Sequence, residues 1–211
     1  DPQTFTITIS PVADTPSITG GTTLEDTQSS SGLVISRNAV DGTEVTHFKI
    51  TNITSGTLYQ NDGTTSISSG SFITYAEGNA GLKLSPTGDF NGSASFKLQA
   101  SLSSVDGGLG GSVVTASITV TAVNDVPVIT GQTDILTTDE DIPLDINLEN
   151  LEVDDIDNNY PSDFILMVLD GENYTIEERT VTPGSNYFGD LTVPVYVDDG
   201  GSENSQSNTF N

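Results

Sequence analysis

The stretch Val123-Asn124-Asp125-Val126-Pro127 lies at the junction of two β-rich parts of the chain. An apolar run with strand-like alternation enters it from Thr115, and a new apolar run leaves it over residues 128–131. Proline fixes its own φ and pushes the preceding residue toward an extended conformation, so this stretch predicts a short, stiff connector. Asn124 and Asp125 place oxygen ligands on that connector.

The same junction occurs earlier in the chain. Residues 4–20 align without gaps on residues 115–131, 111 positions later, and nine of the 17 aligned residues are identical. A fixed period of this length marks a tandem array whose repeat has the size of a small β-sandwich. We therefore divide the chain into the last strand of a preceding repeat (1–13), one full repeat (14–124) and a second repeat (125–211) that lacks most of its closing strand.

Alternating apolar residues and turn signals predict an all-β fold with about seven strands in the full repeat. Thr4–Ile9 and Leu191–Val197 are predicted as strands, and Asn61-Asp62-Gly63 as a hairpin turn. Residues 147–152 are predicted to form one short helical turn. Since the second repeat lacks its last strand, we expect an open sheet edge near the C-terminus.

Charge is strongly negative and unevenly spread. The chain has 211 residues with 30 Asp and Glu against five Lys and Arg, a net charge of −25. Residues 1–123 carry a net −6 and residues 124–211 a net −19. Such a surface repels nucleic acid and anionic lipid. The excess of negative charge has two interpretations. The acidic residues could form a solubilising or halotolerant surface, or some of the carboxylates could hold divalent cations.

Composition excludes several classes of protein. The chain has no cysteine, which rules out disulfides and thiolate metal sites. No run of about 18 apolar residues occurs, so no membrane insertion is expected. Neither a nucleophile elbow nor a phosphate-binding glycine loop is present, and we expect no enzyme activity.

Acidic residues gather in a few short clusters. Calcium takes six to eight oxygen ligands, several of them carboxylates, and a site between tandem sandwiches can draw on both. Three clusters of the second repeat qualify: the connector, the Asp154–Asn158 loop and the Asp198–Gly200 strand end. Glu25-Asp26 is a further acid pair in the first repeat, and Glu140-Asp141 is its equivalent in the second.

These motifs resemble the cadherin-like repeats of very large bacterial surface proteins. In that family a Val-Asn-Asp-x-Pro joint is combined with a Glu-Asp-Thr, an early Asp-x-Asp and a late Asp-Gly. Here these are residues 123–127, Glu25-Asp26-Thr27, Asp155-Ile156-Asp157 and Asp199-Gly200. The candidate metal ligands are Glu25, Asp26, Asn124, Asp125, Asp154, Asp155, Asp157, Asp198 and Asp199.

The resemblance implies two tandem Ig-like, cadherin-like β-sandwich domains joined by a short proline-containing linker. It implies Ca²⁺ at the interdomain joint and a role as an extracellular adhesion or spacer module. The partners would be neighbouring repeats of the same chain, and a cell-surface protein or polysaccharide.

The first repeat departs from this pattern. Its early loop reads Asp41-Gly42-Thr43-Glu44, its late Asp-Gly is displaced to Asp106-Gly107, and Ala13 stands where the second joint has asparagine. We expect a weaker site or none at this joint, with Asp14, Asp41, Glu44 and Asp106 as its candidates.

Two other interpretations stay open. Asp-Gly pairs are turn signals in themselves, and we interpret Asp62 and Asp170 as turn residues. The domains could instead form a carbohydrate-binding accessory module, which requires exposed aromatic rings. The candidate rings are Tyr59, Tyr75, Tyr160, Tyr174 and Tyr187.

Overall fold

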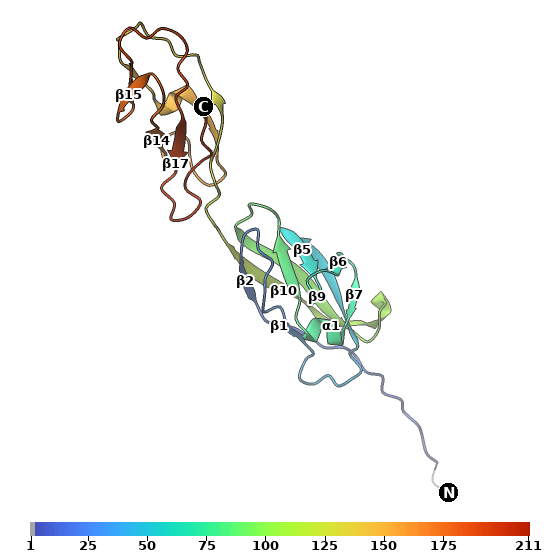
Figure 1. Cartoon of the computed structure of the whole chain (residues 1–211). Coiled ribbons are helices and arrows are strands. Elements are labelled where there is room, and N and C mark those ends of the chain that lie inside the picture. The colour runs from blue at the N-terminus through green and yellow to red at the C-terminus, as the bar shows by residue number, and fades with distance from the viewer. Residues whose placement is uncertain (1–2) are drawn as a thin grey trace. The chain divides into compact units, whose positions relative to one another are not determined.

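The computed structural model describes residues 3–211, which form two compact units (Figure 1). Unit 1 ends at Val123 and unit 2 begins at Asn124. The structure therefore separates the two units inside the connector stretch, one residue before the boundary predicted from the repeat.

Unit 1 is a β-sandwich. Its larger sheet has the order β2-β10-β9-β4-β7 and a second sheet has the order β6-β5-β8, while β1 and β3 pair separately. The bounds are β1 Ser17–Ile18, β2 Gly21–Leu24, β3 Ile35–Ser36, β4 His47–Thr54, β5 Gly56–Tyr59, β6 Ser66–Ile67, β7 Phe72–Thr74, α1 Tyr75–Asn79, β8 Lys83–Pro86, β9 Gly92–Ser101, η1 Asp106–Gly108 and β10 Leu109–Thr121.

Alternation along the strands builds the core of unit 1. Phe48 and Ile50 of β4, Phe96 of β9, and Leu58 and Leu84 of the smaller sheet are fully buried in one cluster. Since successive residues of a strand point to opposite faces, one face of each sheet supplies the apolar side chains that meet between them.

Strand β10 is central to the unit. It pairs antiparallel with β9 and parallel with β2, where Ile118 lies opposite Gly21 and Thr121 opposite Leu24. The sheet therefore joins the first and last parts of the unit side by side (Figure 1).

Gly110 and Gly111 have a structural role at the start of β10. A Cβ on Gly110 would lie 2.3 Å from the Ala13 carbonyl oxygen, and one on Gly111 would lie 2.3 Å from the Thr15 nitrogen. Glycine is needed here because the backbone around Ala13 passes so closely. Ala13 is itself buried, 2% exposed.

Unit 2 contains three small sheets, β11-β13, β12-β16-β15 and β14-β17, around a second apolar cluster. The bounds are β11 Val128–Gln132, β12 Leu144–Asp145, η2 Leu148–Asn150, β13 Leu151–Asp154, β14 Ile165–Val168, β15 Tyr174–Glu177, β16 Thr180–Pro183 and β17 Val195–Asp198. The predicted helical turn at 147–152 is confirmed as the 3-10 turn η2. The fold is nearly all β, as the sequence predicts.

The hairpin prediction is also confirmed. Leu58 pairs with Ile67 across the turn, and Asp62 accepts hydrogen bonds from the backbone of Thr64 and Thr65 and from the Thr65 hydroxyl. These bonds, led by that of the Thr65 hydroxyl, lower the pKa of the Asp62 carboxyl to about 2. Asp62 is a turn residue.

The strand prediction for Thr4–Ile9 is wrong for this structure. No strand is assigned over residues 3–16, and Phe5, Ile7 and Ile9 are 92%, 83% and 89% exposed. A strand needs a hydrogen-bonding neighbour, and within residues 3–211 no other segment pairs with this one.

Two further predictions, one of a strand and one of an open sheet edge, need correction. Leu191–Val197 becomes a strand only from Val195 onward, and the open edge expected beside it is partly covered. Residues 205–210 run along β17, with single bridges between Val195 and Phe210 and between Asp198 and Gln206.

Candidate metal centre

On the unit 1 side of the connector, the central group is the carboxylate of Glu25. This side chain is 2% exposed and accepts a hydrogen bond from the backbone N–H of Val123. The Glu25 N–H in turn donates to the Thr121 carbonyl (3.0 Å). Glu25 therefore holds the end of β10, directly before the connector.

Asp26 follows in a tight turn and is joined to Asp89. Both residues have positive φ, 56° in each case, a conformation that aspartate tolerates better than most residues. Asp26 Oδ1 accepts a hydrogen bond from the Asp89 N–H (3.1 Å), and carboxylate oxygens of the two residues lie within 4.8 Å of each other. Two negative groups are thus held together at this end of unit 1.

On the unit 2 side, Asn124 links the connector to the end of β17. Its Nδ2 donates to Asp199 Oδ2 (2.9 Å) and to the carbonyls of Glu203 (3.2 Å) and Asn204 (3.3 Å). Asp199 is 9% exposed, and its other oxygen accepts from the Gly201 N–H (2.8 Å). The connector amide and the strand-end carboxylate therefore form one network.

Asp125 is joined to the early loop. Its N–H donates to Asp157 Oδ2 (2.8 Å), and Asp155 Oδ1 accepts from the N–H groups of Asp157 (2.9 Å) and Asn158 (2.7 Å). Three of the predicted ligand clusters of the second repeat therefore come together within unit 2.

The donor set suits a hard divalent cation. The groups present are carboxylates and backbone carbonyls, the ligands that calcium takes. Within residues 3–211, Asp155 Oδ2 is a buried carboxylate oxygen with no hydrogen-bond partner. A buried negative oxygen of this kind is costly without a compensating charge, and a bound cation would supply one.

Two of the predicted ligands lie outside this network. Asp154 is exposed on β13, in register with Val128. Asp198 accepts from the Gly200 N–H (2.8 Å) and from the Gln206 amide (3.3 Å).

The first joint has part of the same arrangement. The Asp14 N–H donates to both Asp41 oxygens (3.2 and 3.3 Å), as Asp125 does to Asp157. Glu44 accepts from the Gly42 N–H (2.8 Å), which lowers the pKa of its carboxyl. Asp106 is ion-paired with Lys49 at 2.5 Å.

Asp89 was missed by the sequence analysis, and so were the Glu203 and Asn204 carbonyls. A signal for Asp89 existed, because residues 86–92 recur as 183–189. Asp141 Oδ1 accepts from the Asn186 N–H (3.0 Å), which repeats the Asp26–Asp89 bond. The Asp141 φ of 64° and the Asn186 φ of 55° match those of the first pair. The Glu203 and Asn204 carbonyls could not be identified from the sequence, because every residue has a backbone carbonyl oxygen.

Most candidate tyrosines are engaged in the fold. The Arg37 guanidinium stacks 3.6 Å from the Tyr75 ring centroid, and the Tyr160 and Tyr174 hydroxyls donate to backbone carbonyls of Leu148 and Leu169. These rings therefore do not provide an exposed platform for a sugar.

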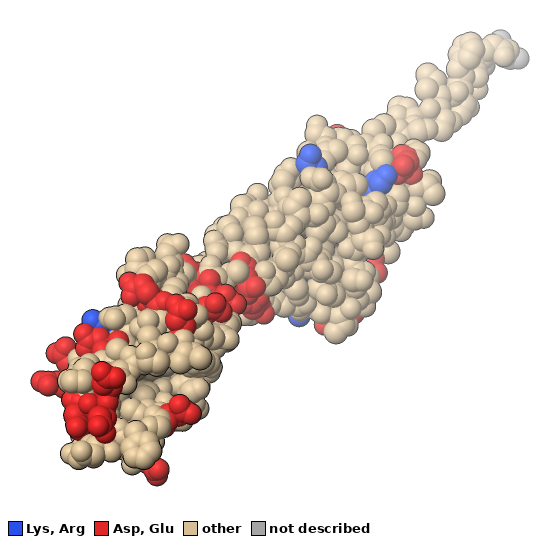
Figure 2. All heavy atoms as spheres, turned by 90° about the horizontal axis from the view of Figure 1, so that it is seen from above, with Lys and Arg blue, Asp and Glu red and all other residues tan. Residues whose placement is uncertain are grey.

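The acidic residues gather on unit 2, as the face drawn in Figure 2 shows. Residues 124–211 contain Arg179 as their only Lys or Arg. Within the described residues, no helix has the length and apolar character needed to cross a membrane.

Comparison with known proteins supports the fold. No family model matches the chain, and no curated protein matches it in sequence. Among solved structures, domains EC22–24 of mouse cadherin-23 match 93% of this chain and 64% of their own with 14% identity and a TM-score of 0.51. A second match is to extracellular cadherin domains 1–5 of protocadherin gamma B2, with 14% identity, 93% of this chain and 38% of that chain covered, and a TM-score of 0.47. A third is to Drosophila N-cadherin EC1–4, with 13% identity, 94% of this chain and 48% of that chain covered, and a TM-score of 0.46. The chain spans less than two thirds of each. It has a cadherin-like β-sandwich fold.

Proposed function

We propose that this chain is a calcium-binding adhesion or spacer segment of a large extracellular protein, of the kind that bacterial surface proteins carry. Ca²⁺ binds at the connector and stiffens the joint between the two units. The observation that carries the proposal is the arrangement of the groups on either side of residues 123–125. Glu25 accepts a hydrogen bond from the Val123 N–H. Asp157 accepts one from the Asp125 N–H, and Asp199 accepts one from the Asn124 amide.

The physical argument is electrostatic. Asp125, Asp155, Asp157 and Asp199 form one hydrogen-bonded neighbourhood with Asn124, inside a unit of net charge −19. Carboxylates this close repel one another, and a divalent cation turns that repulsion into attraction. Adjacent residues of the connector belong to the two units, so an ion bound at the connector would remove freedom at the joint.

The cadherin-like fold and the −25 net charge support placement at a cell surface, with neighbouring repeats of the same chain as the immediate partners. A cell-surface protein or polysaccharide would be the adhesive partner.

The test is calorimetric titration of the full chain with CaCl₂. We expect binding that is lost in an Asp125→Ala, Asp157→Ala double variant. The matched control is Asp134→Ala, Asp170→Ala, which removes the same charge from exposed loops of the same unit. Equal binding by all three proteins would refute a calcium site at the connector.

Small-angle scattering tests the mechanical part of the proposal. We expect the distribution of interatomic distances to sharpen in calcium and to broaden in chelator, because a bound ion limits the orientations of the two units. A distribution that does not change, in a protein shown by calorimetry to bind calcium, would mean that the ion does not stiffen the joint.

A further inference from the structure

Strand β14 of unit 2 has a hydrogen-bonded neighbour on one side only. It pairs with β17 through four residue pairs without a bulge, and within residues 3–211 these two strands form a sheet of their own. Figure 1 shows β14 and β17 side by side. The other side of β14, together with its exposed side chains Ile165 and Met167, is termed the β14 edge.

The backbone groups on the β14 edge belong to Leu166 and Val168. In β17, Val195 exchanges two backbone hydrogen bonds with Phe210 (2.9 Å each), on the side away from β14. The direction of hydrogen bonding alternates along a strand, so Val195 does not bond to Val168, its partner in the register. The N–H and C=O of Val168, and by the same alternation those of Leu166, therefore point to the open side.

Unit 1 covers the equivalent strand. Residues 191–197 repeat residues 94–100, which makes β17 the counterpart of β9 and β14 the counterpart of β4. In unit 1, β7 pairs with β4 along the side that β14 leaves open. There the N–H of Ile50, the counterpart of Val168, donates to the Ser71 carbonyl (2.9 Å).

The length of one internal connection explains this difference. In unit 1, residues 60–82 lie between the paired strands β5 and β8 and include β6, β7 and α1. In unit 2, the paired strands β15 and β16 are separated by Glu178 and Arg179 alone. Unit 2 therefore has a tight turn in place of the segment that would cover β14.

The outward side chains of the two strands also differ. The β4 residues equivalent to Ile165 and Met167 are the polar His47 and Lys49, whereas Ile165 and Met167 are 62% and 41% exposed. Proteins usually protect a free edge with lysine, proline or a bulge. Residues 164–169 contain no charged side chain and no proline. A free, apolar edge of this kind favours association with another strand.

Charge selects the class of partner. Asp163 and Asp170 border the apolar run and are exposed, and Arg179 is the only Lys or Arg of residues 124–211. A second copy that paired through its own β14 edge would bring together two units of net charge −19. A segment with Lys or Arg at its ends would instead be attracted to the two bordering carboxylates.

We propose that the β14 edge binds an extended, basic segment of a partner protein by strand addition. The backbone of the segment bonds to Leu166 and Val168. Apolar side chains at alternate positions of the segment contact Ile165 and Met167. Lys or Arg at its two ends lie near the carboxylates that border the apolar run. The proposal does not depend on calcium at the connector.

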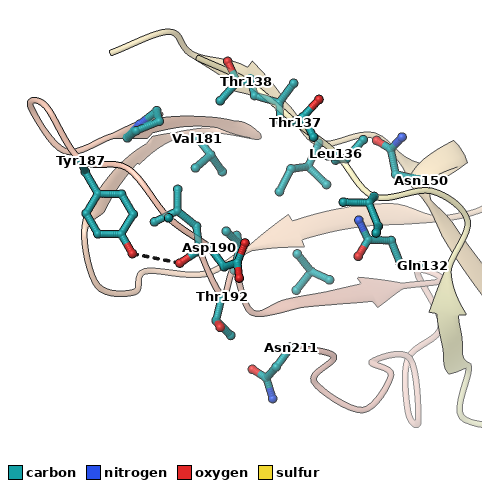
Figure 3. A pocket seen from close by; sticks show the side chains of 18 of the residues that line it. Gln132, Leu136, Thr137, Thr138, Asn150, Val181, Tyr187, Asp190, Thr192 and Asn211 are labelled. Carbon is teal, nitrogen blue, oxygen red and sulfur yellow. Dashed lines mark hydrogen bonds between the residues drawn. The ribbon is translucent and has the colours of Figure 1, made fainter. Parts of the chain in front are cut away.

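Unit 2 has a second surface that an apolar segment can reach, and an experiment must distinguish the two. This is a pocket of about 860 Å³, shown in Figure 3 with Leu136 and Val181 directed into it. Its lining includes the exposed side chains of Ile135 and Phe188 but no residue of β14. Substitutions can therefore separate the pocket from the β14 edge.

The first test is calorimetric titration of the full chain, in chelator, with a peptide of alternating valine and threonine that has lysines at both ends. We expect binding that falls roughly tenfold in an Ile165→Thr, Met167→Thr double variant, because two cross-strand contacts are lost. Threonine retains strand propensity. The matched control is Ile135→Thr, Phe188→Thr, which should bind like the parent chain. Equal binding by all three proteins, or a loss in the pocket variant alone, would overturn the proposal.

The second test concerns charge. Asp163→Asn, Asp170→Asn should bind the lysine peptide more weakly than the parent chain and with less dependence on salt. The control is Asp134→Asn, Asp139→Asn, which removes the same charge from the connection between β11 and β12. A peptide with glutamates in place of the lysines should not bind. Equal weakening in both variants would indicate general attraction to an acidic unit and would contradict the proposal.

Hydrogen exchange identifies the contact itself. We expect the Leu166 and Val168 amides to exchange roughly tenfold more slowly when the lysine peptide is bound, because they gain partners. A peptide with the same side chains and N-methylated amides should not bind. Protection confined to other segments, or equal binding of the methylated peptide, would exclude strand addition. A chain that binds no peptide and self-associates through Ile165 and Met167 would assign the β14 edge to a second copy, which also overturns the proposal.

Discussion

Single polar residues with left-handed backbone build the turns on which the candidate centre depends. Asp26 and Asp89 in unit 1, and Asp141 and Asn186 in unit 2, have φ between 55° and 64°. In each pair the first carboxylate accepts the N–H of the second residue. Aspartate and asparagine suit these positions because their short side chains offset the strain of a positive φ.

Gly201 is the residue that gives Asn124 its space. A Cβ added there would lie 2.7 Å from Asn124 Nδ2 and 3.1 Å from Asp199 Oδ1. We expect Gly201→Ala to displace the Asn124 amide and to weaken calcium binding at the connector by about tenfold, the usual cost of losing an outer-shell partner. The measurement is calorimetric titration.

Gly107→Ala is the control for that change. A Cβ at Gly107 meets no atom within 4 Å, so calcium binding should stay as in the parent chain. If Gly201→Ala also left binding unchanged, the Asn124–Asp199 contact would have no part in the site.

At the scale of elements, the short helix α1 shows where sequence patterns are insufficient. The run Phe72–Tyr75 predicts a strand, and the structure has β7 followed by a five-residue helix. Such a helix is too short to show a period of 3.6, and contacts made elsewhere decide it. Gly78 packs against Phe48 and Ile35, where a Cβ would lie 3.0 to 3.3 Å from their side chains. The one local signal was Thr74 and Glu77, which form a capping box.

We expect Glu77→Ala to destabilise unit 1 by about 1 kcal/mol at pH 7, the usual cost of losing a cap. The Thr74 N–H donates to the Glu77 carboxylate and holds its pKa below the ordinary 4.5. This contribution is present above pH 4.5 and is lost as the pH falls through the lower folded pKa. Denaturant unfolding of both proteins should therefore show a difference that shrinks below pH 4.5. A difference that is the same at every pH would assign the effect to lost packing.

For the whole molecule, calcium should act on stability as well as on shape. A ligand that binds the folded state stabilises it by about 2.7 kcal/mol at 100 times its Kd. We expect thermal unfolding to move to higher temperature in calcium and to return in chelator. Magnesium at the same ionic strength is the control, because it retains its waters and requires stricter geometry. An equal shift with both ions would indicate simple charge screening.

The division into two units and the β class could be predicted from the 111-residue repeat and the period-two alternation. The pairing of the strands could not, because the parallel contact of β2 with β10 joins residues about 97 positions apart. For the candidate centre, the acids of the connector, the early loop and the strand end were identifiable from their types. Asp155, Asp157 and Asp199 belong to the hydrogen-bonded network, whereas their neighbours Asp154 and Asp198 do not. Loop geometry decides which of two adjacent aspartates points into the network, and the sequence does not show this.

The parallel register of β2 and β10 has a mechanical consequence. The chain enters unit 1 ahead of Gly21 and leaves it after Thr121, at opposite ends of this strand pair. A force that pulls the two ends of unit 1 apart would therefore load the hydrogen bonds between the two strands in shear, all at once, rather than peeling them apart one by one. Unit 1 is therefore arranged to resist pulling on its two ends.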